Sequence, residues 1–189
     1  EKGLKLLNRA LDLSLDSKNL IGITFCKNVT NTMNYMLQGK IDFAYQSSEE
    51  ILEEAENVGD IFVKRISQCS YGSSCYFKGF FDKAKDNLLN GWMFCEKANH
   101  VAWGSWSSGW LGYVFADMGE YKEAQDYYEK AILMLENARL FPSFVHVWKA
   151  SIARAKETAT ISMIFIDLFY HYKMTSLLSK EPKPLFSQR

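Results

Sequence analysis

The sequence predicts an all-α protein built from stacked, antiparallel helix pairs. Three glycines recur at a constant interval of forty positions, and an alanine follows each of them five places later (Gly39 and Ala44, Gly79 and Ala84, Gly119 and Ala124). Between them, apolar side chains recur at steps of three and four, as they do on one face of an α-helix. Only three of the 189 residues are proline, two of them in the last eight, so little interrupts long helices.

Each of the three glycines is expected to form the turn between the two helices of a pair. Glycine adopts the left-handed conformation that ends a helix, because it has no Cβ to clash with the backbone. An aromatic or branched residue follows two places later and is expected to fill the junction (Ile41, Phe81 and Tyr121). The alanines are expected where the two helices of a pair cross.

The elements are predicted in a regular order along one domain, residues 1–178. The array consists of a half repeat, three complete helix pairs and a degenerate fourth pair (1–16, 19–57, 60–97, 101–139 and 142–178). The helices of the complete pairs are predicted at about 19–37 and 41–57, 60–77 and 81–97, and 101–117 and 121–139. Cap-forming residues such as Asn19, Asp60 and Asn99 separate the pairs. Within the fourth pair, a helix from Pro142 to about Glu157 precedes its expected partner at 161–178. Residues 179–189 are expected to form a mobile tail.

The third pair shows the small and large packing positions most clearly. They are predicted in its first helix at three positions and in its second at four (Leu111, Gly112 and Phe115; Tyr121, Ala124, Tyr128 and Ala131). This pattern resembles the tetratricopeptide repeat (TPR). The resemblance implies a TPR-like α-solenoid, a right-handed superhelical stack. It also places Gly3, Leu7 and Ala10 at the crossing positions of the half repeat.

The repeat unit is longer than is usual in this family, whose standard unit has about 34 residues. The difference lengthens each helix by about one turn, on the order of 5 Å. Units of this length resemble the extended repeats of maltose-regulon-activator-type regulators. The phrase that begins at Gly119 and continues through Ala153 to Lys156 is also similar to repeat regions of large bacterial multidomain proteins that carry a nucleotide cyclase or kinase domain and a P-loop ATPase. This resemblance covers residues 1 to about 158.

Composition argues against several classes of function. The formal net charge is zero, so the chain lacks the basic excess typical of nucleic-acid binding. The four cysteines form no CxxC pair and are expected to be buried free thiols in a cytoplasmic protein. The apolar run from Ile161 to Tyr170 is too short to span a bilayer. The chain begins at Glu1 without a signal peptide, and we expect it to be a segment of a larger protein.

In TPR proteins the first helix of each pair lines a concave groove, and the resemblance implies a partner-binding groove here. Its predicted residues change along the array from methionine-rich through aromatic to charged (Met33, Met36, Ile66, Cys69, Ser73, Tyr76, Phe77, Trp106, Tyr113, Asp117, His146 and Lys149). Such a groove suits an amphipathic helix or an extended peptide. In the alternative interpretation, these side chains contact neighbouring helices or are covered by other parts of the parent protein.

Tryptophans mark one stripe of the predicted helix at 101–117. Trp103, Trp106 and Trp110 lie at i, i+3 and i+7, a spacing that is typical of packing against a neighbouring helix. Trp106 is predicted to be the exposed exception. The two remaining tryptophans, Trp92 and Trp148, are also predicted to pack.

The preferred function is a non-catalytic protein–protein interaction or sensor module of a larger bacterial signalling or transcription-regulating protein. No P-loop, dinucleotide-binding, metalloprotease or nucleophile-elbow motif occurs, and no histidine pair has metal-ligand spacing, so we expect no enzyme, metal or cofactor. The expected partner is a protein or peptide, including other domains of the parent chain. Two alternatives are a small-effector sensor, with a pocket near Met33, Tyr76 and Trp106, and an architectural module that forms homo-oligomers.

Overall fold

The structure is a computed structural model that describes residues 2–139 and 142–156, and every regular element in these ranges is helical. Eight α-helices follow one another (α1 Lys2–Asp16, α2 Leu20–Thr30, α3 Ile41–Val58, α4 Ile61–Phe77, α5 Phe81–Lys97, α6 Val101–Asp117, α7 Tyr121–Ala138 and α8 Pro142–Lys156). The all-α prediction is therefore confirmed for this part of the chain. The predicted partner helix at 161–178 and the predicted tail at 179–189 lie outside the described residues.

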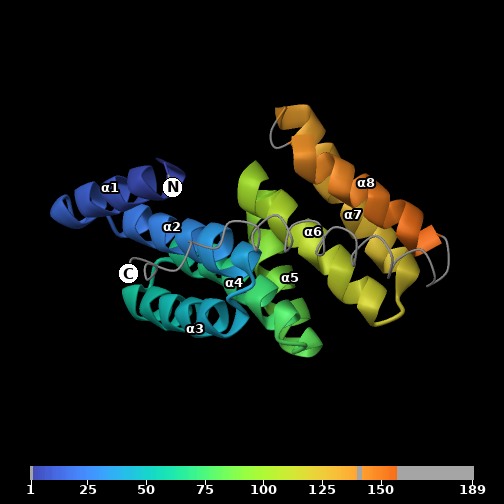
Figure 1. Cartoon of the computed structure of the whole chain (residues 1–189), viewed down its shortest axis with the longest axis horizontal. Coiled ribbons are helices and arrows are strands. Elements are labelled where there is room, and N and C mark those ends of the chain that lie inside the picture. The colour runs from blue at the N-terminus through green and yellow to red at the C-terminus, as the bar shows by residue number, and fades with distance from the viewer. Residues whose placement is uncertain (1, 140–141, 157–189) are drawn as a thin grey trace, which may run out of the picture.

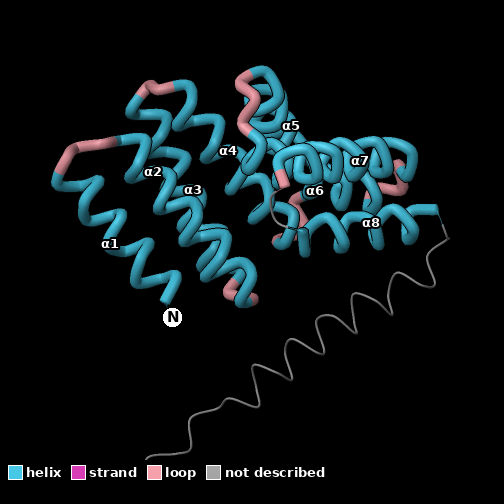
Figure 2. The backbone as a smooth tube through the Cα atoms, turned by 90° about the horizontal axis from the view of Figure 1, so that it is seen from above, coloured by secondary structure: helices cyan, strands magenta, loops and turns pink. Residues whose placement is uncertain are grey.

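The helices are laid out in chain order along the long axis of the molecule (Figure 1). Each helix contacts the next one, and α4 also contacts both α2 and α6. Short turns connect α1 to α2 and each pair of successive helices from α3 to α7 (Figure 2). Apart from one interruption after α2, the helices begin and end within one residue of the predicted bounds.

One residue with a left-handed backbone follows the end of each helical segment up to α7. These residues have φ between 50° and 83° (Lys18, Gly39, Gly59, Gly79, Asn99, Gly119 and Arg139). At the three recurring glycines, the next residue's N–H donates to the carbonyl oxygen five places back, as from Phe80 to Cys75 at 2.9 Å and from Glu120 to Phe115 at 2.8 Å. This is the Schellman closure of a helix end. The predicted turn positions of the three glycines are confirmed.

The helix predicted at 19–37 is not continuous, and that prediction is wrong in this detail. A π-helical turn, Asn31–Tyr35, and a 3₁₀ turn, Met36–Gln38, follow α2. The segment from Lys18 to Gly39 is one residue longer than each later segment between successive left-handed positions. A π turn accommodates one residue more than the α-helix it interrupts. The extra residue in this segment is therefore absorbed inside the helix rather than in a loop.

Small residues face large ones where the helices of a pair cross. A Cβ on Gly112 would lie 2.5 Å from the ring of Tyr128, and one on Gly72 would lie 2.7 Å from Cγ of Leu88. The equivalent positions of the first pair hold Thr32 and Ser48, which are both buried. As the residue on the second helix grows from serine to leucine and tyrosine, its counterpart on the first helix shrinks to glycine. Close packing at equivalent places is thus kept with different side chains.

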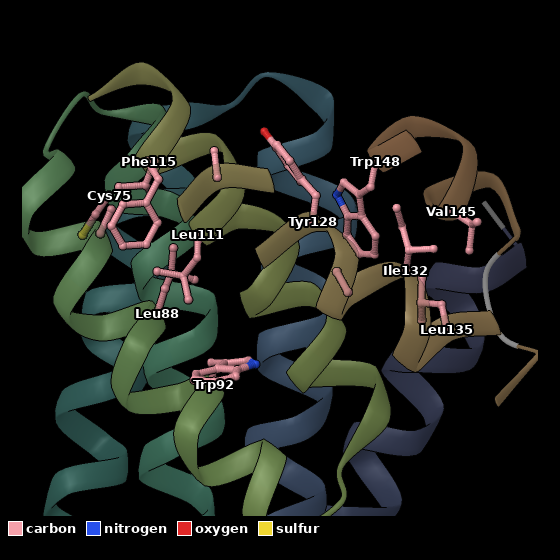
Figure 3. Packing of buried hydrophobic residues seen from close by; sticks show 14 of the residues in the cluster. Cys75, Leu88, Trp92, Leu111, Phe115, Tyr128, Ile132, Leu135, Val145 and Trp148 are labelled. Atoms are coloured by element: carbon pink, nitrogen blue, oxygen red, sulfur yellow. The ribbon is translucent and has the colours of Figure 1, made fainter. Parts of the chain in front are cut away.

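The larger core cluster extends from α4 to α8, with side chains from successive helices lying side by side (Figure 3). The three alanines that follow the turn glycines are fully buried. All four cysteines are buried free thiols, and Trp92, Trp103 and Trp148 are buried, as predicted. None of the described helices is both long and apolar enough to cross a membrane.

Tyr121 does not fill its junction, so its predicted packing role is wrong. Its side chain is 52% exposed, whereas its equivalents Ile41 and Phe81 are half-buried. Phe81 packs against Tyr76, with 5.9 Å between ring centroids. The equivalent of Tyr76 in the next pair is Ala116, which offers Tyr121 no ring to pack against.

Gly112→Ala is expected to lower the free energy of unfolding by about 1–3 kcal/mol, because the new methyl group overpacks against Tyr128. Combining Gly112→Ala with Tyr128→Ser restores the small–small pairing of the first unit. The double variant should therefore lose less stability than the sum of the two single variants. Urea unfolding followed by circular dichroism measures these differences.

Gly119→Ala is the control for this cycle. No atom lies within 4 Å of a Cβ at Gly119, so its cost of about 1–2 kcal/mol comes from the left-handed backbone alone. Tyr128→Ser should not relieve that cost. Strict additivity of Gly112→Ala and Tyr128→Ser would contradict the proposed steric pairing.

Candidate partner-binding surface

Four half-buried aromatic side chains meet where α4 lies against α6, and we call them the aromatic face: Tyr76, Phe77, Trp110 and Tyr113. The ring of Trp110 is central, with centroids 4.9 Å from Phe77, 5.4 Å from Tyr76 and 5.2 Å from Tyr113. These tilted and edge-to-face arrangements are the favourable ones for aromatic pairs. The result is a continuous apolar surface that joins two helices far apart in sequence.

Helical spacing brings these side chains together. Tyr76 and Phe77 are in the last turn of α4, and Trp110, Tyr113 and Asp117 follow at i, i+3 and i+7 on α6. The Tyr76 hydroxyl donates a hydrogen bond of 2.6 Å to Oδ2 of Asp117, which is exposed. This bond places a carboxylate at the edge of the aromatic face.

The aromatic face is also connected to α8. Ser151 Oγ donates a hydrogen bond of 3.0 Å to the Tyr113 hydroxyl. Trp106, one turn before Trp110, packs edge-to-face on Phe144, with 5.8 Å between centroids. Helices α4 and α6 therefore form the aromatic face, and α8 packs against α6 and supports the face.

Four residues of the predicted groove lie inside the protein. Met36, Ile66, Cys69 and Ser73 are each at most 2% exposed, and Met33 lies in the π-helical turn. These buried residues present no surface to a partner in this conformation. Their predicted role as an accessible groove lining is corrected accordingly.

Buried polar contacts join α4 to α2 and to the π-helical turn that follows α2. Asn28 Nδ2 donates to Ser67 Oγ at 3.2 Å, and Asn31 Nδ2 donates to Ser70 Oγ at 3.4 Å. All four side chains are fully buried. Serine is small enough to let the helices approach closely, and the amides occupy the remaining space.

Trp106 is buried, so the prediction that it is the exposed tryptophan of its stripe is wrong. It is 7% exposed, and its indole Nε1 donates to Ser73 Oγ at 3.3 Å. Neighbours on both sides cover the ring, because α4 supplies the serine and α8 supplies Phe144. Trp110 instead is the half-buried tryptophan of the surface. In the sequence, the aromatic residues at 106 and 113, on the same side of the helix, were the signal that Trp110 belongs to an aromatic cluster.

The predicted charged end of the groove is at the surface on α8. His146 and Lys149 are exposed, and Lys149 Nζ pairs with Glu136 Oε1 of α7 at 2.5 Å. An ion pair between exposed groups contributes little to stability. These two residues therefore remain accessible on α8.

A second polar cluster, outside the predicted groove, joins α3 to α4. The hydroxyls of Tyr71 and Tyr45 donate to Glu49 Oε1 at 3.0 and 3.2 Å. Burial, with a smaller effect of the hydrogen bond to Tyr45, raises the pKa of Tyr71. The Tyr71 phenol stays protonated at neutral pH, so it can donate a hydrogen bond from α4 to Glu49 of α3.

Among the described residues, no three histidine, cysteine, aspartate or glutamate side chains gather in a way that would hold a metal ion. Comparison with protein-family models finds no family that matches the chain. A search of curated protein sequences finds no match to it either.

The buried thiol of Cys75 predicts how stability depends on pH. Burial raises its pKa from 9.0 to about 11, so the folded state disfavours the thiolate. The unfolding free energy should therefore be at its full value below pH 9 and should fall as the pH rises from 9 to 11. Cys75→Ala should reduce this fall.

Urea unfolding at a series of pH values under reducing conditions measures the effect. Cys69, whose pKa burial also raises, keeps part of the dependence in the Cys75→Ala variant. Identical slopes for the wild-type chain and Cys75→Ala would show that Cys75 does not titrate on unfolding as described.

Proposed function

We propose that this chain is a TPR-like α-solenoid, a right-handed superhelical stack that serves as a non-catalytic protein–protein interaction or sensor module. Its support is the regular recurrence of the turn glycines, the fully buried alanines and the small–large crossings from one helix pair to the next. The module belongs to a larger bacterial signalling or transcription-regulating protein. Four buried free thiols agree with a cytoplasmic location.

The aromatic face is the observation that carries this proposal. Tryptophan and tyrosine are enriched at the centres of protein interfaces, because they bury a large apolar area and keep a polar group for hydrogen bonding. Here Trp110 and Phe77 supply apolar area, while Tyr76 and Asp117 supply polar groups at the edge. The surface fits one side of an amphipathic helix or an extended peptide.

The charge at the edge of the surface refines the chemistry of the partner. Asp117 contributes an exposed carboxylate beside the rings. A row of lysines and arginines, which would favour a terminal carboxylate or a phosphate, does not line the aromatic face on the described helices α4 and α6. The proposed ligand therefore combines an apolar side chain, placed on Trp110, with a basic side chain next to Asp117.

Signal transmission follows from where the partner binds. The aromatic face spans α4 and α6, and the Tyr113 hydroxyl accepts a hydrogen bond from Ser151 of α8. A ligand that inserts against Trp110 stabilises one spacing of these helices over others. In this proposal, a neighbouring domain of the parent protein senses that change in spacing.

A displayed library of random peptides, selected on the 189-residue chain, tests the proposal. Fluorescence anisotropy then gives the affinity of selected peptides for variants of the aromatic face. Trp110→Ala should weaken binding by about 1–3 kcal/mol, or roughly 5- to 150-fold, as expected for an aromatic anchor. Asp117→Lys, a change at an exposed side chain, should weaken basic peptides most.

Tyr121→Ala is the matched control, because it removes an exposed aromatic ring from α7, a helix that contributes no residue to the aromatic face. It should leave the affinity unchanged. Thermal unfolding verifies that each variant is folded. Equal binding by the wild-type chain, Trp110→Ala and Asp117→Lys, or selection of no peptide, would contradict the proposed function.

A further inference from the structure

Residues 157–189 follow α8 in the sequence, and α8 brings the start of this segment close to the aromatic face. Ser151 of α8 donates a hydrogen bond of 3.0 Å to the hydroxyl of Tyr113 in that face. Five residues, or about 7.5 Å of helix, separate Ser151 from Lys156, where α8 ends. The residues that follow can therefore reach the aromatic face without a long linker.

The segment 161–178, for which the sequence predicts a helix, is strongly apolar in its first half. From Ile161 to Tyr170, Asp167 is the only charged residue. Large side chains recur at i, i+4, i+7 and i+11, on one side of the predicted helix, and we call them the segment stripe: Ile161, Phe165, Leu168 and Tyr172. An apolar stripe of this size is expected to pack against another apolar surface, because exposing it to water is unfavourable.

The crossings of the described helix pairs show that α8 is a poor match for this stripe. Gly112 crosses Tyr128 in the third pair, so that a small residue faces a large one. The positions forty residues further on hold Ile152 and Leu168. Two large side chains would overpack a crossing as close as that one. The turn glycine is also replaced, by Ala159. The segment stripe therefore fits the aromatic face better than the second helix of a fourth pair.

The length and charge of the segment match the aromatic face. Packed helices lie about 8–10 Å apart, so a helix that crosses from α8 over α6 to α4 covers about 16–20 Å. The helical distance from Ile161 to Lys173 is about 18 Å. Such a crossing places the segment stripe on Trp110 and brings Lys173 to the far side of α6. There the carboxylate of Asp117, which accepts the hydrogen bond from Tyr76 of α4, has the opposite charge.

We propose that residues 161–178 are an internal ligand of the aromatic face, with the segment stripe against Trp110 and Lys173 beside Asp117. This inference rests on the proposed function, because the segment supplies the apolar and basic side chains proposed for an external partner. The chain then inhibits its own partner binding, since an external peptide has to displace the segment. The apparent affinity of that peptide falls in proportion to the fraction of molecules whose aromatic face is unoccupied.

Disulfide crosslinking within the 189-residue chain tests the docking directly. The double variant Asp117→Cys with Lys173→Cys places two thiols where the proposed opposite charges meet. Mild oxidation with diamide should therefore link them within one chain, as detected by mass spectrometry of the digested protein. The wild-type chain gives the background, because its four cysteines are buried.

Asp117→Cys with Tyr170→Cys is the matched control. Residue 170 lies about 160° around the predicted helix from the middle of the segment stripe, so a docked segment points it away from α6. This pair should crosslink far less. Equal crosslinking of the two pairs, as expected of a segment that does not dock, would overturn the proposal. Crosslinking of neither pair, as expected if the segment completes a fourth helix pair, would overturn it as well.

Peptide affinity tests the inhibition. Phe165→Glu places a charge in the segment stripe, and it should raise the affinity of a selected peptide for the full chain by about fivefold or more. Phe186→Glu, the same substitution outside 161–178, should leave that affinity unchanged. If Trp110→Ala weakens peptide binding but Phe165→Glu does not strengthen it, the internal ligand is overturned and the proposed function stands. If the disulfide forms but neither the wild-type chain nor Phe165→Glu binds a peptide, the proposed function is overturned instead.

Discussion

One left-handed residue at the end of each helical segment is the constraint on which the arrangement of this chain depends. From Gly39 to Arg139 these residues are evenly spaced, and the helices between them, α3 to α7, have 17 or 18 residues. Because helices of nearly equal length alternate with equivalent turns, every second helix carries the same packing positions. Equivalent positions then meet equivalent neighbours, which is why glycine and tyrosine cross in one unit where glycine and leucine cross in another. The segment before Gly39 has one extra residue, which the π turn accommodates, so Gly39 still forms the turn that ends the segment.

The helices could be predicted from the sequence because their ends are encoded locally. Turn glycines and cap residues act on backbone groups within a few residues of themselves. Asp60, for example, accepts hydrogen bonds from the N–H groups of Phe62 and Val63. The π turn could not be predicted, because one extra residue fits a loop or a helix equally well until packing decides. The burial of Tyr121 was predicted wrongly for a similar reason. Its burial depended on the residue at position 116, which is alanine where the preceding unit has tyrosine.

The candidate surface was predictable only in part. The TPR resemblance implied that Tyr76, Phe77, Tyr113 and Asp117 line one side of the array, and the structure brings these residues of α4 and α6 together. The resemblance did not distinguish Trp106 from Trp110, because the ring that covers Trp106 belongs to Phe144, two helices later. Nor did it show that serines and asparagines would close the interface of α2 with α4. Exposure along a helix stripe is set by the neighbouring helices, and a single-helix pattern does not contain them.

Deletion of one whole unit tests most directly whether the interval between the turn glycines defines a stacking repeat. Removing residues 79–118 joins Lys78 to Gly119, retains a turn glycine and places Gly72 opposite Tyr128, as Gly112 is now. We expect the shortened chain to stay helical and to unfold in one cooperative urea transition, followed by circular dichroism. Removing only 79–98 keeps the turn residue Asn99 but should abolish that transition, because α6 would take the place of α5 beside α4. Loss of cooperative unfolding on removal of 79–118, or its retention on removal of 79–98, would contradict the repeat architecture.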